Sequence, residues 1–179
     1  MLNYAKKYIR KTFMKRLFLC RHGKSSWDKP FLADHKRPLA PRGIRNSKEM
    51  AYRLASKKIL PNLIISSNAE RAKQTAKIFA DILGVGKNNL QLTSELYLAS
   101  PTEILKHIRK TSSSVDTLFI FGHNPGFTDL VVELGEDLEN LPTAGIFGFT
   151  FDVEDWADIG KKNAKTWFFD FPKNRPDQN

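Results

Sequence analysis

The sequence predicts an α/β fold with a mostly parallel central sheet flanked by helices on both faces. Three observations predict this class. The chain has 179 residues, which suits one domain with its own core. Hydrophobic residues make up 41% of it and charged residues 27%, as in a folded chain rather than a disordered one. Short apolar runs typical of buried strands alternate along the chain with longer segments whose apolar residues recur at helical spacing.

The first predicted strand covers residues 17–20, an apolar run that ends in Arg21, His22 and Gly23. Residues 25–42 contain three prolines and no periodicity, so a long loop is expected there, and long loops in compact domains are usually functional. A helix is predicted over residues 43–58, where apolar residues recur at helical spacing.

The second strand is predicted at residues 62–66, followed by a helix over 68–83. Ser67 stands three residues before Glu70, which is a capping-box pattern, and glycines follow the helix. A short strand is predicted at 90–93, and a further helix runs from 100 to about 110.

Residues 117–121 form the most apolar strand segment, and the pattern of Leu130, Val131 and Leu134 predicts a helix after it. The last two strands are expected at 146–153 and 165–171. They are expected to pair with each other and to add an antiparallel edge to the sheet.

The sequence divides into a basic N-terminal extension, residues 1–13, and one predicted domain, residues 14–179. The extension carries four basic residues and no acidic one. No apolar run reaches 18 residues, so no membrane span is expected. The single cysteine, Cys20, cannot form an internal disulfide, which favours a cytoplasmic compartment, and its place in the first strand indicates a buried side chain.

The net charge is +10, from 29 basic and 19 acidic residues, and such a surface attracts anions. The aromatic residues lie mostly in the strand segments and are not interleaved with basic ones, so no stacking platform for nucleic acid is expected. Phosphorylated proteins and small phosphate esters remain as candidate partners.

Polar residues follow three of the predicted strands. The strand at 17–20 leads to Arg21 and His22, the strand at 62–66 to Arg71, and the strand at 117–121 to His123 and Asn124. Ligands of open α/β sheets bind at the carboxyl ends of the strands, so we expect these side chains to converge. Two guanidinium groups and two imidazoles near helix N-termini predict a site for a tetrahedral oxyanion, with phosphate as the obvious candidate.

Other phosphate chemistries fit the sequence poorly. A P-loop would need a glycine five positions before Gly23, where Phe18 stands. A cysteine phosphatase would need an arginine six positions after Cys20, where Ser26 stands. No pair of histidines is spaced for zinc, so neither a metal nor another cofactor is expected. Covalent catalysis by a histidine remains, because a neutral imidazole is nucleophilic near pH 7.

Three blocks of sequence resemble the histidine phosphatase superfamily, the phosphoglycerate-mutase-like fold. They are Arg21-His22-Gly23, the segment from Ser66 to Thr75, and Gly122-His123-Asn124-Pro125. The stretches around Trp27 and around Arg37-Pro38-Leu39 are similar to the SixA-type phosphohistidine phosphatases. The resemblance implies a metal-independent phosphatase without a large lid domain. It implies His22 as the phosphorylated nucleophile, with Arg21, Arg71 and His123 in the phosphate pocket.

The resemblance leaves the general acid open. In larger family members a Glu follows the third strand, which makes Glu95 the positional candidate, and Asp28 and Asp34 in the long loop are further candidates. Asp28 stands where the family pocket often has Asn, so it is also a candidate for substrate binding. A phosphohistidine substrate relaxes the need for an acid, because imidazole leaves more easily than an alkoxide.

Three functions are carried forward. The first is a phosphatase acting on phosphohistidine in a protein, and the second is a small-molecule phosphomonoesterase of the same superfamily. The third, of another class, is a basic phosphate- or nucleic-acid-binding module without catalysis.

Overall fold

The structure, a computed structural model, describes residues 14–174. The basic extension predicted at residues 1–13 lies outside the described residues, so the domain boundary at residue 14 stays a prediction.

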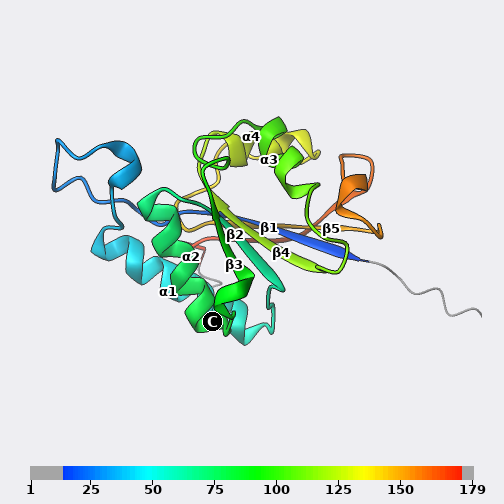
Figure 1. Ribbon diagram of the computed structural model, residues 1–179, viewed down its shortest axis with the longest axis horizontal. Helices are drawn as coiled ribbons and strands as arrows, with labels where there is room; N and C mark the ends of the chain where they lie inside the picture. Colours follow the sequence, from blue (N-terminus) through cyan, green and yellow to red (C-terminus); the bar gives the residue numbers. More distant parts are fainter. Residues whose placement is uncertain (1–13, 175–179) are drawn as a thin grey trace, which may run out of the picture.

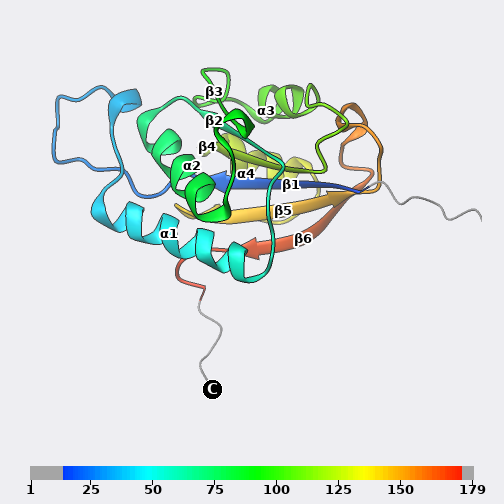
Figure 2. The ribbon, with the colours of Figure 1, turned by 60° about the horizontal axis from the view of Figure 1, so that its bottom comes forward.

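A single mixed sheet of six strands forms the centre of the described chain, in the order β3-β2-β4-β1-β5-β6 (Figures 1 and 2). The four strands from β3 to β1 run parallel, while β5 is antiparallel to β1 and β6 to β5. The predicted parallel sheet with a late antiparallel edge is therefore confirmed. The strands are β1 Lys15–Arg21, β2 Leu63–Ser67, β3 Leu90–Thr93, β4 Thr117–Gly122, β5 Ile146–Phe151 and β6 Ala164–Asp170.

Helices cover both faces of this sheet, as predicted, with α1 and α2 on one side and α3 and α4 on the other (Figure 1). β1 shows why two layers of helix are needed. Phe18 and Cys20 point into the core on the side of α1 and α2, while Leu17 and Leu19 point into the core on the opposite side. Cys20 is buried, as the sequence indicated. The helices are α1 Pro41–Ser56, α2 Glu70–Leu83, α3 Pro101–Ile108 and α4 Gly126–Glu133.

Two helix starts differ from the prediction. α1 begins at Pro41, two residues earlier than expected, since proline is well suited to the first position of a helix. α2 begins at Glu70, and the capping box predicted for Ser67 and Glu70 is wrong. Ser67 is the last residue of β2, and its hydroxyl accepts a hydrogen bond from the Ala69 amide and contacts His123.

Residues 25–40 form the predicted long loop, which projects from the carboxyl ends of the parallel strands (Figure 1). A single 3-10 turn, η1 Asp34–Lys36, is its only helical part. The base of this loop packs tightly on α1: a Cβ atom on Gly43 would lie 2.2 Å from the Lys24 carbonyl oxygen, so only glycine fits there. No helix within residues 14–174 has the length and apolar character needed to cross a membrane.

Candidate active site

The three polar blocks meet at the carboxyl edge of the parallel strands. Arg21 of β1 pairs in register with Gly122 of β4, so His22 and His123, one residue further along each strand, are neighbours. Their ring centroids are 5.0 Å apart. Arg71, in the first turn of α2, completes a group of three side chains that are each more than nine-tenths buried. The structure thus brings together residues that are far apart in the sequence, as the strand-end argument predicted.

The His22 ring is held in one orientation. Its Nδ1 lies 2.7 Å from the Gly23 carbonyl oxygen, which can only accept a hydrogen bond, so Nδ1 carries the proton. Nε2 is then unprotonated, and its lone pair accepts a hydrogen bond of 3.2 Å from Arg71 Nε. A fixed neutral imidazole beside a guanidinium is suited to attack on an anionic phosphoryl group.

Arg71 is the centre of the cluster. In addition to the hydrogen bond from its Nε to His22, Arg71 makes two bonds to Asp34. Its Nη1 donates to the Asp34 backbone oxygen at 2.7 Å, and its Nη2 donates to the Asp34 carboxylate at 2.9 Å. The Arg71 side chain therefore fastens the long loop to α2, and the Leu39 amide adds a second link by donating to the Gln74 side chain of α2 at 2.8 Å.

Arg21 and Asn124 lie side by side through a shared partner, the segment at Asn140 and Leu141. Arg21 Nη1 donates to the Leu141 carbonyl oxygen at 2.7 Å, and Asn124 Nδ2 to the same oxygen at 3.1 Å. Arg21 Nε and Asn124 Oδ1 are buried and have no partner within the described residues. Of these two atoms, Arg21 Nε carries a hydrogen that a bound oxyanion could accept, whereas Asn124 Oδ1 can only accept a hydrogen bond.

His123 is oriented by Ser67, whose Oγ lies 2.9 Å from His123 Nε2. The second ring nitrogen, Nδ1, is buried without a partner within residues 14–174. Buried polar atoms without partners are rare in native proteins, so His123 Nδ1 is an atom that a bound ligand or a water molecule could engage.

Tyr97 and His35 belong to the site but were not among the predicted residues. Tyr97 donates its hydroxyl hydrogen to the Asp34 carboxylate at 2.8 Å, and its ring meets the rings of His35 and His123 edge-on. His35 in turn contacts Asn68 Oδ1 at 2.8 Å. Tyr97 follows β3 by only four residues, and that nearness to a parallel strand end was the signal that could have found it.

Two candidate acids lie in other surroundings. Glu95 contacts His107 at 2.8 Å and Lys110 at 3.7 Å, both near α3, and the His107 hydrogen bond and the Lys110 charge lower its pKa. Such a carboxyl group favours its ionised form, so its role as an acid stays a prediction without geometric support. Asp28 is exposed on the long loop and accepts a hydrogen bond from the Ser26 hydroxyl at 2.8 Å. Its role in substrate binding also stays a prediction.

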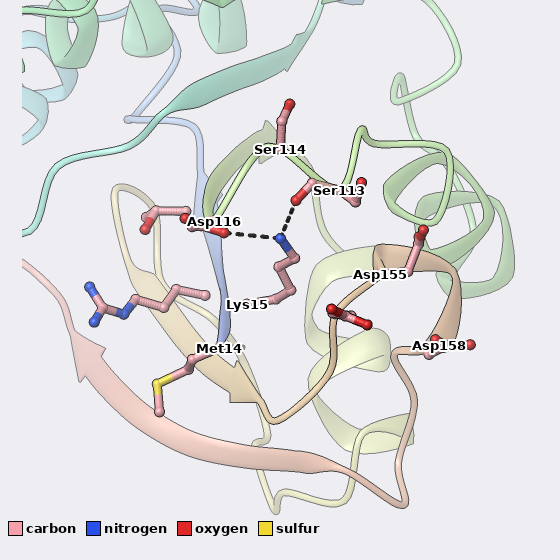
Figure 3. Close-up of a pocket in the computed structure, with 10 residues that line it drawn as sticks. Met14, Lys15, Ser113, Ser114, Asp116, Asp155 and Asp158 are labelled. Carbon is pink, nitrogen blue, oxygen red and sulfur yellow. Dashed lines mark hydrogen bonds and ion pairs between the residues drawn. The ribbon is translucent and has the colours of Figure 1, made fainter. Parts of the chain in front are cut away.

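A cavity of about 740 Å³ lies elsewhere, where β1 and β4 begin (Figure 3). His22 follows the other end of β1. The Lys15 ammonium group is held at the cavity by the Ser113 carbonyl oxygen and by Asp116. None of the candidate site residues lines it. Within the part of the chain that the structure describes, no group of three or more His, Cys, Asp or Glu residues could hold a metal ion.

Both imidazoles of the cluster resist protonation. Burial lowers the pKa of His22 to about 4, with the Arg71 and Arg21 charges acting the same way and the Gly23 hydrogen bond acting against them. Burial, followed by the neighbouring His22 and Arg71, lowers the pKa of His123 to about 3. Both rings are therefore neutral in the folded protein at neutral pH.

We expect this burial to make stability depend on pH. Between pH 6.5 and about 4 the unfolded His22 binds a proton that the folded one does not, so the free energy of unfolding should fall as the pH falls through this window. Denaturant unfolding at a series of pH values should show a shallower dependence in a His22→Gln variant, because carboxylates titrate equally in both proteins. Equal slopes would contradict the depressed pKa.

The comparisons with known proteins agree with this geometry. The sequence pattern of the histidine phosphatase superfamily (branch 1) matches residues 17–97. An uncharacterized protein of Mycobacterium tuberculosis is 31% identical over 165 residues, which cover 86% of this chain and 99% of the relative. An uncharacterized chloroplastic protein of Arabidopsis thaliana is 33% identical over 123 residues, 64% of this chain, and the match spans only 56% of that relative.

Solved structures give the same result. The protein histidine phosphatase SixA in complex with tungstate superposes with a TM-score of 0.76 at 25% identity, over 89% of this chain and 98% of that one. A protein assigned as phosphohistidine phosphatase SixA of Agrobacterium tumefaciens superposes with a TM-score of 0.69 at 28% identity. The match covers 75% of this chain and 90% of that one. Fold and sequence together define a hydrolase of the phosphatase class. The chain belongs to the histidine phosphatase superfamily, in its SixA-type branch.

Proposed function

We propose that this phosphatase removes the phosphoryl group from phosphohistidine in proteins, through a covalent phosphohistidine on its own His22 and without a metal. The observation that carries the proposal is the fixed His22 ring, whose Nε2 lone pair is presented beside the Arg71 guanidinium. The similarity to SixA proteins, whose names specify phosphohistidine or protein histidine as the target, supports the substrate class.

The chemistry proceeds in two displacements on phosphorus. His22 Nε2 forms a bond to the phosphoryl phosphorus, and the bond to the leaving imidazole breaks. Water then attacks the phosphorus, and the bonding pair returns to His22 Nε2, which releases inorganic phosphate. Arg21, Arg71 and the Nδ1 atom of His123 stabilise the negative charge on the phosphoryl oxygens in both steps.

The exposure of the candidate site suits a protein substrate. The Arg71 side chain is buried, but the Asp34 carboxylate that it holds is half exposed, so the cluster lies just below the surface. No separate lid domain is present within residues 14–174. The 25–40 loop projects from the body of the domain (Figure 2), and its Asp34 contacts the cluster through Arg71. A phosphorylated side chain on a protein surface could reach such a shallow site. We place this activity in the cytoplasm, because a lone buried cysteine suits a reducing compartment.

The test is to trap the intermediate. The protein is mixed with a phosphohistidine-containing peptide labelled with ³²P, in the presence of EDTA, and quenched in base, where phosphohistidine survives. We expect labelled protein with the label mapped to His22, together with release of inorganic phosphate. Label on another residue, or turnover that EDTA abolishes, would overturn the proposal, and turnover of p-nitrophenyl phosphate alone would favour the phosphomonoesterase alternative.

A further inference from the structure

The Asp34 carboxylate stands at the entrance of the candidate site, and its contacts suggest more than a structural role. Its Oδ2 atom accepts hydrogen bonds from Arg71 Nη2 at 2.9 Å and from the Tyr97 hydroxyl at 2.8 Å. The side chain is nevertheless 50% exposed, and Oδ1 makes no hydrogen bond within residues 14–174. One oxygen is thus fixed by the protein while the other is open to a ligand.

The carboxylate lies next to the atom that would attack phosphorus. The Nε and Nη2 groups of an arginine form one edge of the planar guanidinium, and their N–H bonds point the same way. On Arg71 this edge binds His22 Nε2 through Nε and Asp34 Oδ2 through Nη2. A negative charge therefore sits beside the place where a phosphoryl group would be exchanged between two nitrogens.

Aromatic rings form the wall around this charge. The Tyr97 and His35 rings meet edge-on with centroids 4.8 Å apart, and Tyr97 continues to His123 at 5.5 Å. Burial would raise the pKa of Asp34, but hydrogen bonds from Tyr97 and Arg71 hold it below the usual range, so the carboxylate is ionised at neutral pH. A flat cation that carries an N–H group matches an anionic group with an aromatic surround.

On the basis of the proposed function, we infer that Asp34 determines specificity by accepting a hydrogen bond from the protonated imidazole ring of the phosphohistidine substrate, which favours cleavage of P–N over P–O bonds.

The chemistry shows what this bond contributes. If the substrate ring carries a proton on the nitrogen that is not phosphorylated, the phosphorylated ring is a cation. His22 Nε2 forms its bond to phosphorus, the substrate N–P bond breaks, and the electron pair returns to the substrate ring, which leaves as neutral imidazole. The proton stays on the far nitrogen and is held by Asp34 throughout. Without that proton the leaving group would be an imidazolide anion, which is much less stable.

The Asp34 carboxylate does not assist the cleavage of phosphate esters. Their leaving oxygen becomes more negative as the P–O bond breaks and needs a proton donor, whereas an ionised carboxylate repels it. The same charge that assists one class of substrate therefore opposes the other.

The test compares two substrates in matched variants. Asp34→Asn keeps the size of the side chain and an oxygen that can accept from Arg71, but removes the charge. We expect kcat/KM for a phosphohistidine peptide to fall about tenfold or more, the usual effect of losing a charged hydrogen bond. The kcat/KM for p-nitrophenyl phosphate should fall by a smaller factor, so that the ratio of peptide to ester activity decreases. Asp81→Asn, the same change at an exposed position of α2, should alter neither value.

A second variant distinguishes a specific effect on Asp34 from a general loss of structure. Tyr97→Phe keeps the ring and removes the hydroxyl that holds Asp34 Oδ2. It should lower the ratio of peptide to ester activity in the same direction, by a smaller factor.

The outcomes separate the two proposals. An equal fall in kcat/KM for both substrates would show that Asp34 only positions Arg71. No change for either substrate would show that Asp34 does not meet the leaving group, and either result overturns the inference. Wild-type protein that hydrolyses the ester but not the peptide would overturn the proposed function itself.

Discussion

Replacing His22 with alanine should reduce turnover of both phosphohistidine peptide and p-nitrophenyl phosphate by roughly 10⁴-fold or more, as loss of a covalent nucleophile does in other hydrolases. The ring is the only group of the cluster that presents a fixed lone pair next to the Arg71 guanidinium. Arg21, Arg71 and His123 remain in the variant, but they can only bind the phosphoryl group and cannot accept it in the first displacement.

Binding separates this result from a failure to fold. The variant should still bind inorganic phosphate, measured by titration calorimetry, because its cationic residues are unchanged. It should also keep a cooperative unfolding transition. A His22→Ala protein that folds and retains full activity would end the covalent mechanism, whereas one that loses phosphate binding as well would show that His22 organises the pocket.

Replacing Arg71 with lysine should lower kcat/KM by about 10²- to 10³-fold, the usual cost of removing one donor that stabilises developing charge. The charge is kept, but an ammonium group cannot make three bonds in fixed directions to His22 Nε2, the Asp34 backbone oxygen and the Asp34 carboxylate. The long loop would lose hydrogen bonds that attach it to α2, and His22 would lose the guanidinium that orients its Nε2 atom.

Arg53→Lys is the matched control. Arg53 on α1 also makes several bonds, to Glu49, Asp170 and the chain beyond β6, but contacts none of the candidate site residues. The control should lower thermal stability slightly and leave kcat/KM unchanged. If Arg71→Lys were as active as Arg53→Lys, the fixed directions of the three Arg71 hydrogen bonds would not matter for the reaction.

The order of the strands and helices could be predicted from the sequence because hydrophobic periodicity is a local property. The apolar runs at β1 and β4 are long enough to need burial on both faces, which requires helices on both sides of the sheet. The same reasoning placed His22 and His123 together, since both directly follow parallel strands. The exact helix starts were less predictable, as the misassigned capping box at Ser67 shows. That hydroxyl is used by His123, and a sequence pattern cannot show which partner a side chain will choose.

The sequence by itself therefore determined the fold class, the family and the edge of the sheet where the candidate site lies. Only the tertiary structure decided which loop residues complete the site. Glu95 was predicted from its position after a strand, but its carboxylate lies with His107 and Lys110. Asp34 stood in a loop without periodicity, and the hydrogen bonds from Arg71 and Tyr97 bring it to the entrance. Strand ends are fixed by local pattern and sheet geometry, whereas the path of a long loop depends on contacts between side chains that are distant in the sequence.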